Sequence, residues 1–324
     1  MKPIFIFSLP RSGSTLLQRI LASHDKISTT AEPWLLLSCF YALKEKGCLA
    51  EYNHSVLQQG VSDFCQNLPN GKEDYYVAVR HFAEELYGKA SDKQATYFLD
   101  KTPRYSLVVE DVIETFPDGK FLFLWRNPLS LVASMMETWG SGRWNLYYLN
   151  VDLYQGLERL IEANVKYRDS ENCFFCNYED LITSPENWID GVFNYLQLDS
   201  SAEVLGKLSN YEPKGRLGDP TGIHQYDSVN EAPLYKWKKV ICNPFRKAWC
   251  RRYLRWIGKE RLAIMGYDLD ELLSDLGGVP TTWKFFFSDM ILFPYGVLYN
   301  LLELPLLRKK LSDLTSCYRT VAHK

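Results

Sequence analysis

The sequence lacks the features that would assign it to several common classes of protein. Its 324 residues carry 37 Lys and Arg against 39 Asp and Glu, so no general basic surface attracts nucleic acid. Its five histidines never fall at the short spacings of a metal site, and we expect no metal. It also has no internal repeat and no low-complexity segment. We therefore expect a globular protein with local ligand sites and no nucleic-acid partner.

Cysteines are present, but they form no compact framework. The chain has eight, and only Cys173 and Cys176 lie close together in the sequence. Such a pair can bind zinc or carry redox chemistry. Residues 172–177 read as a strand, however, and an odd offset on a strand sends two side chains to opposite faces, so we expect neither role. No charged leader with a cleavage site precedes the first apolar run, and we expect a location in the reducing cytoplasm.

Short apolar runs alternate with helical patterns along the chain. The runs that read as buried strands are residues 4–9, 95–100, 120–125 and 172–177. The helical patterns are residues 13–23, 33–90, 105–115, 128–139 and 150–168. This alternation predicts the α/β class, with a P-loop-like central parallel sheet flanked by helices and ligands bound at the carboxyl ends of its strands. We expect residues 1–278 to form this domain and residues 279–324 to form an apolar helical extension.

The loop after the first apolar run, SLPRSGSTLL, has the length of a phosphate-binding P-loop. Gly13 and Thr15 stand where that loop has its second glycine and its hydroxyl residue, but Ser14 stands where nucleoside triphosphatases have lysine. Backbone N–H groups at a helix start still favour an anion. An ordinary helix start capped by serine is the alternative. We expect the loop to bind a phosphate-like group shorter than a triphosphate, through Arg11, Ser12, Gly13, Ser14 and Thr15.

A second polar cluster follows the third apolar run. Arg126 ends that run, Pro128 suits the first turn of a helix, and Ser134 lies about two helical turns beyond Arg126. Arg126 and Ser134 can therefore face the same ligand, and we expect them to share a second phosphate. A solvated arginine at a strand end is the alternative reading of Arg126.

The two motifs resemble those of the sulfotransferases that use 3′-phosphoadenosine 5′-phosphosulfate (PAPS). The resemblance is closest to the branch of tyrosylprotein and bacterial sulfotransferases, and it covers residues 4–240. It implies that the first loop binds the 5′-phosphosulfate and that Arg126 and Ser134 bind the 3′-phosphate. PAPS would then be the co-substrate, 3′-phosphoadenosine 5′-phosphate (PAP) the product, and no metal would be required.

The resemblance also implies catalytic residues. Glu32 falls where the branch has its general base, and Lys101 is similar to the lysine that stabilises charge on the bridging oxygen. Glu32 lies near the end of a second strand and no histidine is better placed, although it could instead be a structural carboxylate at a helix start. Lys101 follows a strand, where a solvated lysine is the alternative. Arg11 is the third catalytic candidate, and Arg104 is a candidate for contact with the acceptor or a phosphate.

Three further residues complete the expected nucleotide site. Tyr178 follows the fourth apolar run and resembles a family residue near the adenine ring, although a core tyrosine would look the same. Lys214 and Arg216 place two cations on a glycine-containing loop that we expect to close over the 3′-phosphate. Lys236 is a further candidate for that contact, and the sequence does not show which of the three residues makes it.

The C-terminal extension carries a long apolar stretch at residues 283–307. It has about the length of a membrane-spanning helix, but polar residues and two prolines interrupt it. The polar residues Asp289, Asn300 and Glu303 lie with Gly296 on one narrow stripe and leave a wide apolar face. Three alternatives stay open: packing on the protein or on a second copy in a homodimer, peripheral contact of residues 283–310 with an anionic membrane, and a true span. Membrane contact would favour a lipid-linked acceptor.

The sequence therefore predicts an enzyme, a PAPS-dependent sulfotransferase that works by in-line displacement at sulfur. We expect the acceptor to be a hydroxyl of a carbohydrate, a lipid-linked molecule or a small molecule, held by residues 35–95 and 139–148. A P-loop kinase is one alternative, and Ser14 counts against it. A noncatalytic nucleotide-binding protein is the other, and it would need neither Glu32 nor Lys101.

Overall fold

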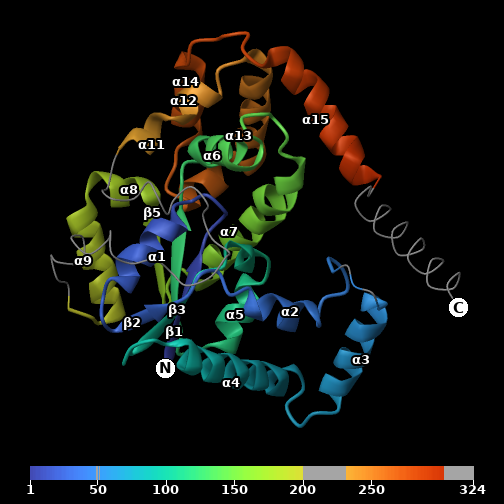
Figure 1. The fold of residues 1–324 in the computed structure, drawn as a ribbon, viewed down its shortest axis with the longest axis vertical. Coiled ribbons are helices and arrows are strands. Elements are labelled where there is room, and N and C mark those ends of the chain that lie inside the picture. Colours follow the sequence, from blue (N-terminus) through green and yellow to red (C-terminus); the bar gives the residue numbers. More distant parts are fainter. Residues whose placement is uncertain (49, 51, 200–230, 303–324) are drawn as a thin grey trace, which may run out of the picture.

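Five parallel strands form the centre of the fold (Figure 1). The computed structural model describes residues 1–48, 50, 52–199 and 231–302. The strands are β1 (Lys2–Phe7), β2 (Ile27–Thr29), β3 (Tyr97–Asp100), β4 (Lys120–Trp125) and β5 (Cys173–Asn177). Their order in the sheet is β2-β3-β1-β4-β5. This arrangement confirms the predicted α/β class with a central parallel sheet.

Strand β1 lies in the middle of the sheet, between β3 and β4. Ile4 pairs with Leu99 of β3, and Phe7 pairs with Phe123 of β4. After β1 the chain builds the sheet towards β2 and β3, and it then crosses to β4 and β5 on the other side. The loops that follow β1, β3 and β4 therefore leave the same edge of the sheet side by side. Such a switch in direction is where open α/β sheets bind ligands.

Helices cover both faces of the sheet (Figure 1). The helices before β3 are α1 (Ser14–Ala22), α2 (Leu35–Tyr41), α3 (His54–Gln66) and α4 (Lys72–Ala90). Between β3 and β5 lie the turns η1 (Pro103–Leu107), η2 (Tyr147–Leu149) and η3 (Val151–Gly156), and the helices α5 (Val109–Thr115), α6 (Pro128–Trp139) and α7 (Leu157–Tyr167). After β5 come α8 (Tyr178–Thr183), α9 (Pro185–Leu196), α11 (Ala232–Tyr235), α12 (Trp237–Val240), α13 (Pro244–Ile264), α14 (Leu269–Gly278) and α15 (Phe286–Leu301).

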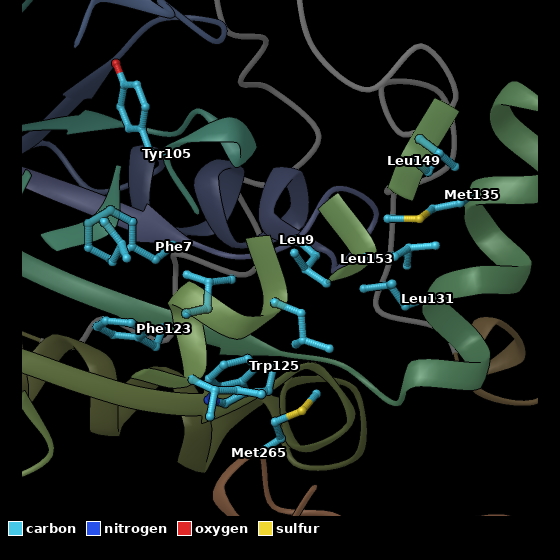
Figure 2. Close-up of a cluster of buried hydrophobic side chains, with 14 of the residues drawn as sticks. Phe7, Leu9, Tyr105, Phe123, Trp125, Leu131, Met135, Leu149, Leu153 and Met265 are labelled. Atoms are coloured by element: carbon cyan, nitrogen blue, oxygen red, sulfur yellow. The ribbon is translucent and has the colours of Figure 1, made fainter. Parts of the chain in front are cut away.

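Two apolar layers form because successive side chains of each strand point to opposite faces. Ile4 and Leu122 belong to the layer that includes residues of α1, α8 and α9. Phe5 and Phe123 belong to the larger layer, which includes residues of α4 to α7, α13 and α14. Figure 2 shows this larger layer continuing to the loop after β1, where Leu9 packs beside Gly156 of η3. The core therefore supports the polar loops at the carboxyl edge of the sheet directly.

The segment 33–90, predicted as one helical stretch, contains three helices. Asn53 caps α3, because its side chain accepts hydrogen bonds from the backbone N–H groups of Ser55 and Val56. Gly71, with φ 61°, directly precedes α4. The helical period in the sequence correctly predicted helical structure, but the cap at Asn53 and the turn at Gly71 divide the segment into separate helices.

The side chains of the close pair of cysteines point to opposite faces of the sheet, as predicted. Cys173 packs with the layer that contains Phe123, and Cys176 belongs to the opposite layer with Leu122. The seven cysteines within the described part of the chain are all free.

The last described helix, α15, is joined to the rest of the protein by a buried ion pair. The carboxylate of Asp289 accepts hydrogen bonds from Nε of Arg246 at 2.7 Å, from the side chain of Asn243 at 2.7 Å and from the backbone N–H of Trp144 at 3.2 Å. A side chain at Gly296 would collide with Asn145. The polar stripe predicted for the extension therefore faces the protein at these two positions. Over the residues that the structure describes, no helix has the length and apolar character needed to cross a membrane.

Candidate active site

The loop between β1 and α1 has the shape of an anion-binding turn. Arg11 has φ 69° and Gly13 has φ 92°, and helix α1 begins at Ser14, so the loop ends at a helix N-terminus. A Cβ atom at Gly13 would lie 2.2 Å from Cδ2 of Tyr178, whose side chain is buried. Both the backbone angle and this contact require glycine at position 13.

Arg11 joins the two predicted phosphate loops. Nη1 of Arg126 donates a hydrogen bond to the backbone carbonyl of Arg11 at 2.6 Å. Nε of Arg11 donates to Oγ of Ser134, on α6, at 3.2 Å. The structure thus brings Arg126 and Ser134 to the same place, and each of them contacts Arg11. The loops after β1 and β4 form one continuous polar site.

Tyr178 lies between these two loops. The guanidinium carbon of Arg126 is 4.4 Å from the centroid of the Tyr178 ring, a cation–π contact, and the ring also lies against Gly13. Tyr178 is only 1% exposed, so its ring is a buried surface on which Arg126 and the β1–α1 loop pack. Nε of Arg126 is buried without a hydrogen-bond partner among the described residues. Contact between Tyr178 and an adenine ring stays a prediction.

Glu32 and Lys101 form an ion pair beside the phosphate loop. Nζ of Lys101 is 2.8 Å from Oε1 of Glu32 and 3.4 Å from Oγ1 of Thr15, the second residue of α1. The indole N–H of Trp34 donates to Oε2 of Glu32 at 3.2 Å. Lys101 is 1% exposed, so its position is fixed. An ammonium group has three N–H donors, and these two contacts leave one for a ligand oxygen.

A buried carboxylate that the sequence analysis did not select holds this pair in place. Asp100, the last residue of β3, is fully buried and accepts hydrogen bonds from the hydroxyl groups of Tyr87 at 2.6 Å and Tyr105 at 2.9 Å. It also accepts one from Thr102, whose Oγ1 in turn accepts from the backbone N–H of Trp34. The network therefore links the strand end that carries Lys101 to the loop that carries Glu32. The sequence signal that could have identified Asp100 is its position as an acidic residue at the end of an apolar strand.

This carboxylate makes stability depend on pH. Burial raises the pKa of Asp100 to about 6, above its unfolded value of about 3.9. Between these values the folded protein holds a proton that the unfolded chain releases, so stability from this group falls as pH rises through that range. We expect the stability of the wild type to fall by about 3 kcal/mol relative to that of Asp100→Asn between about pH 3 and pH 7. Denaturant titrations of both proteins across this range, with the exposed Asp118→Asn as control, measure it; a flat or rising difference would contradict it.

Glu179, also absent from the sequence analysis, fixes the turn after β4. Its Oε1 accepts a hydrogen bond from the backbone N–H of Asn127 at 3.0 Å, and its Oε2 accepts one from the hydroxyl of Tyr267 at 2.6 Å. Gln18 similarly fixes the loop that carries Glu32, because its side-chain amide donates a hydrogen bond to the backbone carbonyl of Thr30. Single residues such as these have no sequence signal, since their partners lie elsewhere in the chain.

Two of the remaining predicted cations, Arg104 and Lys236, form ion pairs with carboxylates of the protein. Arg104 pairs with Asp152 of η3 at 2.7 Å; burial raises the pKa of Asp152 to about 6, and Arg104 opposes this. Lys236 pairs with Glu137 of α6 at 2.8 Å. Lys214 and Arg216 lie outside the described residues. Closure of a basic loop over a nucleotide therefore stays a prediction, as does the absence of a metal.

These observations define a class: an α/β protein with a P-loop-like turn at the switch point of its parallel sheet. The model of the Sulfotransferase family matches residues 3–202. This match covers more than half of the chain, which therefore belongs to the sulfotransferase family.

Comparisons with individual proteins agree with this membership. The chain is 34% identical to the nodulation protein NoeE of Sinorhizobium fredii over 143 residues, which are 42% of this chain and 31% of that protein. It is 26% identical to the protein-tyrosine sulfotransferase of Drosophila melanogaster over 289 residues, 83% of this chain and 52% of that protein. The chain thus spans about a third and about half of these relatives. The sulfotransferase domain from the curacin biosynthetic pathway has the same fold, with a TM-score of 0.53, 20% identity, and coverage of 79% of this chain and 97% of that domain.

Proposed function

We propose that the chain transfers the sulfuryl group of PAPS to a hydroxyl group of an acceptor and releases PAP. Membership of the sulfotransferase family supports sulfuryl transfer. The observation that carries the proposal is the position of Lys101, whose ammonium lies between the carboxylate of Glu32 and the hydroxyl of Thr15. A carboxylate, a buried cation and a phosphate loop without a P-loop lysine thus meet at one point.

The residues at the site fit a doubly phosphorylated adenosine. In this proposal the loop from Arg11 to Thr15 binds the 5′-phosphosulfate, with backbone N–H groups at the start of α1 and the hydroxyl groups of the loop as donors. Arg126 and Ser134 bind the 3′-phosphate. The buried Nε of Arg126 lacks a hydrogen-bond partner among the described residues, and a polar ligand would supply one. Each of these two groups contacts Arg11, so both ends of the nucleotide bind to connected loops.

The proposed reaction is an in-line displacement at sulfur. Glu32 removes the proton of the acceptor hydroxyl as its oxygen forms a bond to sulfur. The bond between sulfur and the bridging oxygen breaks, and its electron pair leaves on the 5′-phosphate of PAP. Lys101 donates its third N–H to that oxygen, and Arg11 adds a second positive charge nearby. Positioning and fixed charge supply the catalysis.

The acceptor meets the protein beside Glu32. Trp34 has φ 55°, its indole donates to Glu32, and its ring is half-exposed. An aromatic ring in this position offers a flat apolar surface to the molecule that carries the hydroxyl. We propose a carbohydrate, lipid-linked or small-molecule hydroxyl as acceptor. Because a protein-tyrosine sulfotransferase is among the relatives, tyrosine peptides belong in the same panel of labelled-PAPS assays.

Calorimetry with PAP and with ATP plus magnesium tests the nucleotide assignment. We expect PAP to bind and ATP with magnesium not to bind, because Ser14 replaces the lysine of triphosphatases. Gly13→Ala should weaken PAP at least about tenfold, since its Cβ displaces Tyr178 and hence Arg126. Gly142→Ala is the matched control, because Gly142 also has positive φ but nothing within 4 Å of its Cβ position. Binding of ATP with magnesium in place of PAP would overturn the proposal in favour of a kinase.

A further inference from the structure

Helix α15 presents an apolar face that the described part of the protein does not cover. Phe287 and Ile291 are 73% and 70% exposed, more than any other large apolar side chain in the described residues. The exposed members recur at helical spacing along one side of the helix: Phe287, Met290, Ile291, Tyr295, Leu298 and Leu301. Figure 1 shows α15 at the outside of the molecule, extending away from the central sheet.

Within residues 283–302 the exposed charge is positive, and the sequence beyond adds Glu303 before three further cations. Asp289 is the only acidic residue between positions 283 and 302, and it is buried against Arg246. Lys284 and Arg143 are exposed near the start of the helix, and Arg143 is next to Trp144, which contacts Asp289. Arg308, Lys309 and Lys310 follow in the sequence, beyond the described residues. The exposed face therefore has cations beside it and no exposed acidic side chain within it.

We propose that α15 binds the surface of an anionic membrane, with its apolar face among the lipid chains and the neighbouring cations on the headgroups. An interfacial helix needs both apolar area and an electrostatic attraction, and the two signals together give stable but reversible binding. Trp283 and Tyr295 suit the boundary between headgroups and chains, where one end of an aromatic side chain is apolar and the other is wet. The buried Asp289 holds the helix on the protein while its other side faces the lipid.

The same charges disfavour a second copy of the chain as the occupant of this face. A two-fold interface brings the same patch of both subunits together, and each would bring its own set of cations. No exposed carboxylate of the described part of α15 is available to pair with them. Anionic headgroups supply the missing negative charge.

Cosedimentation of the full chain with vesicles tests this proposal, and no nucleotide is needed, so the result is independent of the proposed enzyme activity. We expect binding to vesicles of equal parts phosphatidylcholine and phosphatidylglycerol, with weaker binding at high salt. A triple variant, Phe287→Glu with Ile291→Glu and Leu298→Glu, should bind at least about tenfold more weakly. The matched control places three glutamates at apolar side chains exposed elsewhere on the protein, Phe64, Phe82 and Val165, and should bind as the wild type does.

Three results would overturn the proposal. The first is a wild type that does not sediment with the anionic vesicles, or that sediments equally with pure phosphatidylcholine. The second is a triple variant that binds as well as the wild type. The third is a wild-type dimer in analytical ultracentrifugation that becomes monomeric in the triple variant, because α15 would then bind a second copy.

Discussion

Replacing Glu32 by glutamine is expected to lower the rate of sulfuryl transfer by about 10²- to 10⁴-fold, the range for loss of a general base. The amide retains the shape of the side chain and can still accept a hydrogen bond from Lys101, but it cannot take the proton of the acceptor. Lys101 itself stays in place, since it is buried and also contacts Thr15. Affinity for PAP should therefore change little. Transfer from labelled PAPS, together with calorimetry of PAP, separates the two effects.

Glu186→Gln is the control for this experiment. Glu186 is an exposed carboxylate in the first turn of α9, and its loss should leave transfer unaffected. Transfer at the wild-type rate by Glu32→Gln would remove the assignment of the base. A variant that lost both transfer and PAP binding would show that Glu32 has a structural part through its ion pair.

Loss of the Asp289 carboxylate is expected to destabilise the protein by about 3–5 kcal/mol. Asp289 is fully buried, and its carboxylate is the counter-charge of the Arg246 guanidinium, which is only 2% exposed. Asp289→Ala leaves the guanidinium buried without its counter-charge, and it also removes the acceptor for Asn243 and for the backbone of Trp144. Denaturant unfolding of the full chain measures the loss.

The double variant Arg246→Met with Asp289→Leu separates the charge effect from simple loss of contacts. An apolar pair of similar volume has no uncompensated charge, so it should cost less than Asp289→Ala alone. Equal losses in the two variants would mean that packing, and not charge, joins α15 to the protein. A loss of less than about 1 kcal/mol in Asp289→Ala would contradict the prediction itself.

Much of the sheet was predictable because its strands are buried on both faces and appear as uninterrupted apolar runs. Strand β4 begins and ends at the predicted residues, and the other three runs differ from their strands by at most two residues at either end. The short β2 was anticipated only as a strand near Glu32. The breaks inside residues 33–90 were missed because helical periodicity continues across a cap such as Asn53 and a turn such as Gly71.

The site was predictable where one loop carries several residues, and unpredictable where contacts join distant segments. The phosphate loop, Lys101 and Glu32 follow from local motifs and from a family resemblance. The contact between Arg11 and Ser134 spans 123 positions, and only the strand order brings these residues together. The network around Asp100 depends in the same way on the packing of α4 and η1 against β3.

The extension shows a further limit. Its polar stripe was visible in the sequence, but the side of the helix that faces the protein was not, and the buried pair of Asp289 with Arg246 shows that the stripe lies on that side. The sequence pattern of a helix does not identify what its apolar face contacts. Periodicity alone therefore left three alternatives open for this face. Exposure and charge in the folded protein are the observations on which the proposal of membrane contact rests.

The hydrogen bonds that connect Arg126, Arg11 and Ser134 affect how substitutions at these positions combine. Since Arg126 holds the main chain of Arg11, and Arg11 reaches Ser134, removal of any one disturbs the other two. Their contributions are epistatic: the first substitution forfeits most of the shared benefit, and a second adds little.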